Sequence, residues 1–353
     1  MENLMKKLFL TAGIFALACM VLAPSTSYAA RPIRMKMATQ YMDRHVVVQK
    51  VYKPWIEEIK KRTNGRVIIQ LYNPNTIIPD GELWNGLLKD QIDFADHYLT
   101  RFPGVFPATT AAGKLPMAAT NASVASNALW ELVNTVPEMK EEFKDVKLLA
   151  MHGTSPLQVF TCNKEIKTLS DMKGLRFAGA GKDTAIVAKG LGVEAIMQPG
   201  PDLYMALSRN MADGVIYPIP PTRSFKVDEA CHYLLMSSIV TMPCFFAMNK
   251  DRWESLPDDI KQIIEETTGE VMTKALGAAL DAGEKEDFDV MVANGIKVNY
   301  LDPAERMEWK HLIEDEMKAA WMTEIEGKLT NGEAIYEQTK NTFAKYEAAL
   351  SAK

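Results

Sequence analysis

Residues 166–181 read IKTLSDMKGLRFAGAG, and the segments that follow give this stretch its structural meaning. LRFAGA at 175–180 predicts a strand, DTAIVAKGLG at 183–192 a helix, and VEAIMQ at 193–198 a second strand. A strand, a helix and another strand in this order are typical of layered α/β proteins with a parallel or mixed sheet. The stretch therefore favours the α/β class.

The same alternation recurs on both sides of this segment. Strands are predicted upstream at 33–40, 66–72, 92–99 and 147–153, with helical spacing at 46–65, 81–91 and 123–145. Downstream, 229–249 predicts a helix end followed by one long apolar strand, and 256–295 is helical for almost its whole length. Gly269 and Gly277 mark expected bends in that long helix. A helix of this length is long enough to run across two domains.

Residues 1–29 have the pattern of an export signal. Lys6 and Lys7 precede an apolar core of about 15 residues, shorter than the roughly 20 that a membrane span needs, and Ala29 ends a small-residue cleavage site. Cys19 leaves a lipoprotein anchor open as an alternative. We expect cleavage near Ala29 and export to the periplasm, with no later segment apolar enough to cross a bilayer.

Charge and cysteine content exclude several classes of protein. The chain of 353 residues has a formal charge of −5, which becomes −6 without Glu2, Lys6 and Lys7. A mildly acidic protein is a poor partner for nucleic acid. Cys162, Cys231 and Cys244 fit no zinc motif, and both one disulfide and three free thiols remain open.

No cofactor or catalytic motif is present. The glycines at 179 and 181 resemble a phosphate loop, but a P-loop needs glycine at 176 and Ser or Thr at 183, where Arg and Asp stand. The dinucleotide fingerprint lacks its third glycine at 184. No nucleophile elbow, metal-binding histidine spacing or paired acid and base appears. We expect no enzyme activity, no cofactor and no metal ligands, although a metal bridging a ligand is left open.

Several motifs occur together in one order along the chain. They are Leu169-x-Asp171-x-Lys173-Gly174-Leu175, Leu191-Gly192, Tyr204-x-Ala206-Leu207, Asp213-Gly214, and MNKDRWESLPDDIKQIIEE at 248–266. NTIIPDGELWNGLLKDQIDFA at 75–95 and Leu115-Pro116 also fit. With them the chain resembles the solute-binding proteins of tripartite ATP-independent periplasmic (TRAP) transporters, the DctP type. The resemblance covers nearly all of the chain after the leader.

The resemblance implies a two-domain periplasmic binding protein fold, type II-like, with a domain-spanning helix at about 257–293 and a ligand cleft between the domains. Domain I would hold 30–153 and about 240–280, and domain II 154–239 and about 281–353. The protein would capture a small organic acid and deliver it to the small and large membrane permease subunits. A stand-alone ligand sensor and an exported enzyme are the alternatives.

The expected pocket departs from the family pattern. The arginine that pairs with the ligand carboxylate in most members aligns with Ala178, and a second arginine found in sugar-acid binders aligns near Gln158. An asparagine of the family aligns with Tyr217, and an aromatic lid residue with Gly200. A changed anchor leaves the ligand class open between a carboxylate and a short sulfonate.

Three replacements for the lost arginine compete. Arg176 leaves the strand on the same side as Ala178, because strand residues two apart share a face. An arginine elsewhere, among Arg44, Arg101 and Arg223, is the second possibility. The third is a cradle of backbone N–H groups from Ala178 and Gly179 to Gly181, near the start of the next helix.

Other ligand contacts are expected where the family places its cleft. Gln40, Tyr41 and His45 follow the first strand, Glu82 begins a helix, Tyr98 follows the third strand, and His152 ends the fourth. Each has a plain structural alternative. His45 could be an exposed histidine at a helix start, Glu82 an ordinary first-turn acid, and His152 a turn cap.

Overall fold

Two β-sheets form the framework of the protein. The computed structural model describes residues 31–179 and 181–351, so the predicted export signal at 1–29 lies outside the described residues. The strands of the first sheet are β1 (Ile33–Thr39), β2 (Val67–Tyr72), β3 (Phe94–Tyr98), β4 (Val146–Gly153) and β10 (Pro243–Asn249). Those of the second sheet are β5 (Gln158–Thr161), β6 (Arg176–Gly179), β7 (Glu194–Met197), β8 (Gly214–Tyr217), β9 (Tyr233–Met236) and β11 (Lys297–Tyr300).

In the first sheet the strand order is β2-β1-β3-β10-β4. β1 is parallel to β3, whereas β10 is antiparallel to both β3 and β4. β1, β3 and β4 therefore run in the same direction and end at the same edge of the sheet. Open α/β sheets bind ligands outside the carboxyl ends of their strands. This edge is thus the natural place for a site.

In the second sheet the order is β11-β9-β5-β8-β6-β7. β6 is parallel to both β7 and β8, whereas β5 is antiparallel to β8. This register places Gln158, at the start of β5, opposite Tyr217, at the end of β8. The predicted strand–helix–strand at 175–198 is confirmed, because β6, β7 and the helix between them fall within it.

The prediction of one long strand within 229–249 is wrong. This segment forms β9 in the second sheet and β10 in the first. The side-chain Oε1 of Gln158 accepts hydrogen bonds from the backbone N–H groups of Ser237 (2.7 Å) and Ser238 (2.8 Å), and these bonds hold the chain where it leaves β9. The break between β9 and β10 could not be predicted from hydrophobicity, because both strands are largely buried and the sequence across them is continuously apolar.

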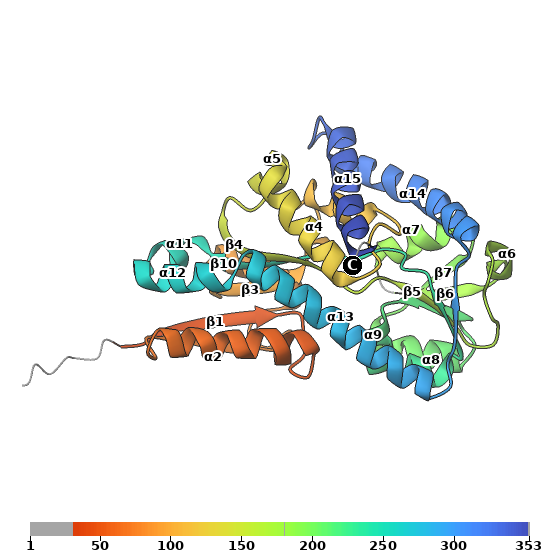
Figure 1. Ribbon diagram of the computed structural model, residues 1–353, viewed down its shortest axis with the longest axis horizontal. Helices are drawn as coiled ribbons and strands as arrows, with labels where there is room; N and C mark the ends of the chain where they lie inside the picture. The colour runs from red at the N-terminus through yellow and green to blue at the C-terminus, as the bar shows by residue number, and fades with distance from the viewer. Residues whose placement is uncertain (1–30, 180, 352–353) are drawn as a thin grey trace, which may run out of the picture. The chain divides into compact units, whose positions relative to one another are not determined.

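Helices cover both sheets (Figure 1). The helices up to residue 190 are η1, a π-helix (Val48–Tyr52), α2 (Lys53–Arg62), α3 (Leu83–Leu88), α4 (Ala122–Thr135), α5 (Pro137–Glu141), α6 (Leu169–Met172) and α7 (Lys182–Gly190), with short 3₁₀ turns η2 (Asp80–Glu82), η3 (Leu99–Arg101) and η4 (Thr109–Lys114). The later ones are η5 (Gly200–Asp202), α8 (Leu203–Ser208), α9 (Ile219–Ser224), α10 (Val227–Ala230), α11 (Lys250–Glu254), α12 (Asp258–Thr267), α13 (Glu270–Ala293), α14 (Pro303–Ile325) and α15 (Gly332–Ser351).

The long helix is interrupted once. Gly269 has a φ of +65°, and its backbone N–H donates to the carbonyl of Leu149 in β4, so α12 and α13 are separate helices. The bend expected at Gly277 is absent, since this residue lies inside α13. A Cβ there would come within 2.8 Å of the Cα of Ser123 in α4, so close helix packing explains this glycine.

α13 connects the surroundings of the two sheets. It packs against α4 and β4 on one side and against α9 on the other, as Figure 1 shows. The C-terminal helices follow the same division, because α14 packs against α7 and α15 against α4. None of the helices among residues 31–351 combines the length and apolar character needed to cross a membrane.

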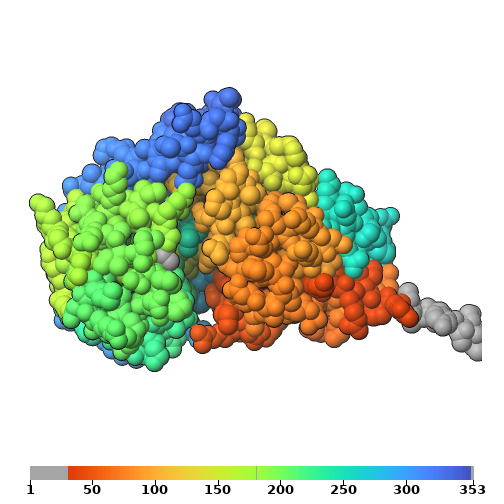
Figure 2. All heavy atoms as spheres, turned by 180° about the vertical axis from the view of Figure 1, so that it is seen from behind, coloured from red at the N-terminus to blue at the C-terminus, as the bar shows by residue number. Residues whose placement is uncertain are grey.

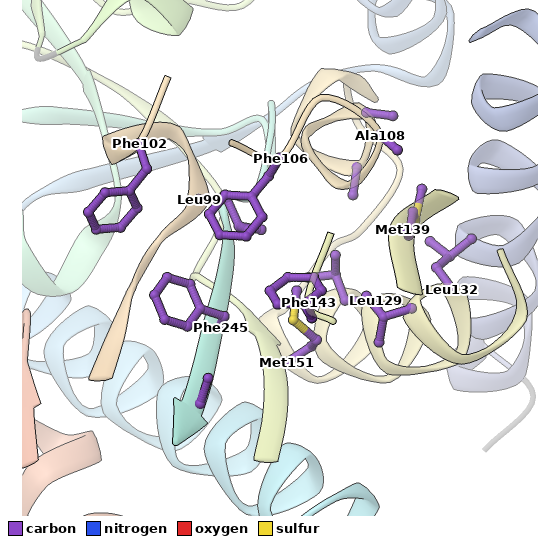
Figure 3. Packing of buried hydrophobic residues seen from close by; sticks show 14 of the residues in the cluster. Leu99, Phe102, Phe106, Ala108, Leu129, Leu132, Met139, Phe143, Met151 and Phe245 are labelled. Carbon is purple, nitrogen blue, oxygen red and sulfur yellow. The ribbon is translucent and has the colours of Figure 1, made fainter. Parts of the chain in front are cut away.

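The larger core lies under the first sheet and is rich in aromatic rings. Phe245, from β10, lies among Phe102, Phe106 and Phe143 in Figure 3. The ring centroids of Trp84 and Phe106 are 4.7 Å apart, in an edge-to-face arrangement that adds to the effect of burial. The strand β10, which lies between β3 and β4, is therefore fixed by its neighbours in the sheet and by this cluster.

Candidate ligand-binding site

A buried polar cluster lies where β1, β3 and β4 end. Asp96 and His152 are both fully buried, and the His152 Nε2 lies 2.9 Å from the Asp96 Oδ1. The hydroxyl of Thr39 donates to the other carboxylate oxygen of Asp96 at 2.9 Å. The His152 Nδ1 is buried and has no hydrogen-bond partner among the described residues. The cluster thus has a polar atom to offer to a ligand.

Tyr41 and His45 form a stacked pair next to His152. Their ring centroids are 4.0 Å apart, and the Tyr41 ring lies 6.2 Å from that of His152. Burial raises the pKa of Tyr41 well above its usual range, so the hydroxyl stays protonated. Burial lowers the pKa of His45 to about 4, so its ring is neutral at pH 7. The Tyr41 hydroxyl is buried without a hydrogen-bond partner in the described part of the chain.

Neighbouring strands place three side chains in one row. Tyr98 pairs with Cys244, and Cys244 pairs with His152, so all three share a face of the sheet with Asp96. The amide Nε2 of Gln40 approaches the Cys244 Sγ at 3.6 Å. From the helical side, Tyr52 interacts with Asp96, which together with burial raises the Tyr52 pKa well above its usual range.

The second sheet brings further residues to this region. Burial, followed by the nearby Cys244 and Tyr217, raises the pKa of Tyr98, so the two partly buried tyrosines lie close to one another. Gln158 is fully buried. Burial raises the pKa of Glu284, in α13, to about 7, and hydrogen bonds with Ser155 and Gln158 limit that shift.

Seven of the predicted contact residues therefore lie at neighbouring positions around the ends of β1, β3, β4 and β8. They are Gln40, Tyr41, His45, Tyr98, His152, Gln158 and Tyr217. Figure 2 shows the surface hollowed between the orange region, which includes β3 and η3, and the green region, which includes α8.

Arg176, Ala178 and Gly179 lie on β6, which runs parallel to β8 and ends beside Tyr217. The guanidinium of Arg176 holds both carboxylate oxygens of Asp213, at 3.0 and 3.2 Å, and the carbonyl of Asn210. The side chain of Ala178 is buried in an apolar cluster. A Cβ on Gly179 would meet the side chain of Thr184 at 2.3 Å.

Glu82 and Arg101 belong to a different set of contacts. The carboxylate of Asp80 lies 2.9 Å from the Nε2 of His97 and 3.3 Å from the Nε of Arg101. The neighbouring His97 and then Arg101 lower the pKa of Asp80. Glu82 is exposed and accepts a hydrogen bond from Asn85 at 3.0 Å. His97 alternates with Asp96 along β3, so this set faces the opposite side of the sheet.

The remaining arginines considered for the anion differ in their surroundings. Arg223 pairs with Asp287 of α13 at 2.6 Å, and Arg44 is exposed.

The part of the chain that the structure describes has no group of three His, Cys, Asp or Glu side chains arranged to hold a metal ion. A surface pocket of about 280 Å³ lies by the ends of β6 and β7, lined by Gly181, Met197, Gln198 and Pro199.

Sequence reasoning missed several members of the cluster. They are Thr39, Tyr52, Asp96, Ser155, Cys244 and Glu284. Asp96 had a usable signal, because an acidic residue inside the apolar strand IDFADHYL is costly to bury without partners. Glu284 had none, since acids are common along an exposed helix face.

Comparison with known proteins gives the family. The model of the DctP family, bacterial extracellular solute-binding protein family 7, matches residues 37–324. The chain belongs to this family. It is a DctP-type solute-binding protein of TRAP transporters, and members of this class bind solutes rather than turn them over.

Individual relatives are distant in sequence and match along most of their length. TsaT of Comamonas testosteroni, described as an outer membrane transporter protein, is 23% identical over 80% of this chain and 83% of its own. The C4-dicarboxylate-binding periplasmic protein DctP of Rhodobacter capsulatus is 22% identical over 84% of this chain and 90% of its own.

Two crystal structures of TRAP solute-binding proteins, each 25% identical and covering 90% of this chain, share its fold. One, from Rhodoferax ferrireducens, holds copurified benzoate and matches with a TM-score of 0.78 over 99% of its own chain. The other, from a marine metagenome, is specific for aromatic acid ligands, holds 3-hydroxybenzoate, and matches with a TM-score of 0.79 over its whole chain. The predicted α/β periplasmic binding protein fold is thus confirmed.

Proposed function

We propose that this protein captures a small organic acid, preferably an aromatic carboxylate, at the cluster around His152, Tyr41 and Tyr98. The observation that carries the proposal is the pair of buried, unpartnered polar atoms, the His152 Nδ1 and the Tyr41 hydroxyl, among aromatic rings. Buried polar groups are nearly always hydrogen-bonded, so such atoms call for a polar ligand or water. The benzoate and 3-hydroxybenzoate held by the two 25% identical relatives support the same chemistry.

The aromatic preference follows from what lines this region. Tyr41, His45, Tyr98 and Tyr217 offer ring faces and edges, and aromatic pairs add about 0.5–1.5 kcal/mol beyond burial. The predicted ligand contacts Gln40 and Gln158 supply polar groups around them, whereas Glu82 is exposed and bonded to Asn85. Arg101, Arg176, Ala178 and Gly179 stay predicted contacts, although Asp80 and Asp213 hold the two arginines and the side chain of Ala178 is buried in an apolar cluster.

We also propose the biological setting. The protein would be exported to the periplasm with its leader cleaved near Ala29, and would hand its ligand to the small and large permease subunits. One domain would hold 30–153 and about 240–280, and the other 154–239 and about 281–353. The strands of each sheet support this division, whereas α15 contacts α4, on the side of the first sheet.

A thermal-shift panel on ligand-free protein tests the ligand class. The panel holds benzoate, hydroxybenzoates, mandelate, aliphatic hydroxy- and dicarboxylates, aryl and short alkyl sulfonates, sugar acids and neutral osmolytes. A ligand at 100 times its Kd adds about 2.7 kcal/mol of stability. We expect the largest shifts from aromatic carboxylates. Shifts confined to sulfonates would mean that the ligand's anionic group is a sulfonate and not a carboxylate. Shifts confined to neutral or aliphatic compounds would contradict the proposal.

A further inference from the structure

Three of the arginines considered for the anion are engaged elsewhere, because Asp213, Asp80 and Asp287 hold Arg176, Arg101 and Arg223. The side chain of Arg44, next to His45, is exposed and lies outside the buried part of the cluster. The basic side chain that the described structure pairs with Asp96 is His152. Since a buried carboxylate without a partner is strongly unfavourable, this contact gives Asp96 the partner that its burial requires and holds the His152 ring in place.

We propose that His152, held and charged by Asp96, takes the place of the missing arginine and anchors the ligand's carboxylate through its Nδ1. The inference rests on the proposed function and names its binding residue. One ring nitrogen is committed to Asp96 at 2.9 Å, so the other is fixed in direction and carries the second proton. A charge-assisted hydrogen bond of this kind is roughly twice as strong as a neutral one.

The groups around His152 fit this role. The protonated Tyr41 hydroxyl is a second donor for the same anion. His45 is neutral at pH 7, so it stacks on Tyr41 without adding charge. The other titratable groups of the cluster are Tyr52, Tyr98, Tyr217 and Cys244, which burial keeps protonated, and Glu284, whose pKa burial raises to about 7. Asp96 and His152 are the acid and the base of this cluster that contact each other directly.

The test is calorimetry of benzoate and 3-hydroxybenzoate binding to ligand-free protein, at several pH values and in buffers of different ionisation enthalpy. Because the anion binds the charged ring, binding takes up protons at alkaline pH, and affinity weakens as the pH rises. His152→Gln should weaken binding roughly tenfold or more and flatten the pH profile. Asp96→Asn should flatten the profile as well.

His97→Gln is the matched control, since His97 is another buried histidine beside a carboxylate but faces the opposite side of β3. It should leave affinity and pH profile unchanged. If the wild type binds benzoate or 3-hydroxybenzoate and His152→Gln binds it with the same affinity and the same pH profile, the inference is overturned and the proposed function stands. If the wild type binds no organic acid of the panel, both are overturned.

A second inference rests on a separate pair of side chains. Cys162 follows β5 and Cys231 follows α10, and their Sγ atoms are 3.2 Å apart in an apolar cluster. We propose that this pair forms a disulfide in the exported protein. The thiolate of one cysteine attacks a disulfide-bonded oxidant and releases one of its thiols. The other cysteine then loses its proton, attacks the mixed disulfide and displaces the second thiol, so two electrons pass to the oxidant.

The bond forms while the chain folds, because both cysteines are buried afterwards. Refolding with glutathione disulfide, alkylation and peptide mapping should link Cys162 to Cys231 and leave Cys244 alkylated. Cys244→Ser should keep the link, and Cys162→Ser should abolish it. Alkylation of both cysteines, or a link through Cys244, would overturn the proposal.

Discussion

The ammonium group of Lys114 is almost completely buried and forms an ion pair with the carboxylate of Asp183. Lys114 ends the turn η4, which contacts β10 of the first sheet, whereas Asp183 lies in the first turn of α7, which packs on β6 and β7 of the second. The exposed fractions are 1% and 16%, so this pair is far better shielded than an ordinary surface pair. It fixes two elements that the sequence separates widely.

Removing one partner of this pair should lower the free energy of unfolding substantially. Asp183→Asn leaves the Lys114 ammonium buried beside a neutral group, and breaking a buried pair in this way costs about 3–5 kcal/mol. The exposed neighbouring pair, Lys182 with Glu324, gives the control, because Lys182→Gln should cost under about 1 kcal/mol. Urea unfolding of both variants measures the difference, and equal small losses would contradict the expectation.

Acid should destabilise the protein through His45. Its pKa is lowered from the ordinary 6.5 to about 4, so the unfolded chain binds more protons than the folded one between these values. The free energy of unfolding should therefore fall as the pH drops from about 6.5 to 4, by at most about 3 kcal/mol. His45→Gln should remove this part of the pH dependence. Parallel stability curves for wild type and variant would rule it out.

Glu284 should act in the opposite direction. Its pKa is raised from 4.5 to about 7 by burial, so its contribution to stability is present below pH 4.5 and is lost as the pH rises through 7. Glu284→Gln should be more stable than the wild type at pH 8, by up to about 3 kcal/mol, and the gain should vanish near pH 4. The exposed Glu286→Gln, on the same helix, should show no such trend.

Gly277 should resist substitution although it lies inside a helix. Gly277→Ala gains about 1 kcal/mol of helix propensity. Its Cβ, however, would force α13 away from the backbone of Ser123, and overpacking of this kind costs about 1–3 kcal/mol. We expect no net gain, or a loss of 1–2 kcal/mol, in chemical denaturation. The exposed Ala278→Gly should cost about 1 kcal/mol through propensity alone, and a clear stabilisation by Gly277→Ala would refute the packing argument.

Local sequence patterns predicted much of the fold. The periodicity of apolar residues predicted the strands around 33–40, 66–72 and 92–99 and the helix after β6. This periodicity arises because such elements bury one or both faces. The split of 229–249 into β9 and β10 depends instead on the side chain of Gln158, which is distant in sequence. β11, α14 and α15 were not assigned, although the large apolar residues that α14 buries recur every four positions, at Trp309, Ile313, Met317, Trp321 and Ile325.

The site was predictable to a similar degree. Tyr41, His45, Tyr98, His152 and Tyr217 were expected at the ends of strands, where the topology gathers side chains from distant segments. Whether they contact a ligand remains a prediction. The ion-pair partners of Arg176 and Arg101 could not be predicted from the sequence. Asp213 and Asp80 look like ordinary surface acids there and come into contact with the arginines only through the fold.

The position of β10 has a consequence for how the chain acquires its structure. β10 is the central link between β3 and β4, yet it follows every strand from β5 to β9 in the sequence. The first sheet therefore cannot close until the chain has passed through the second sheet and returned. Such non-local pairing slows folding. This late closure makes completion of the first sheet wait for the segment that builds the second.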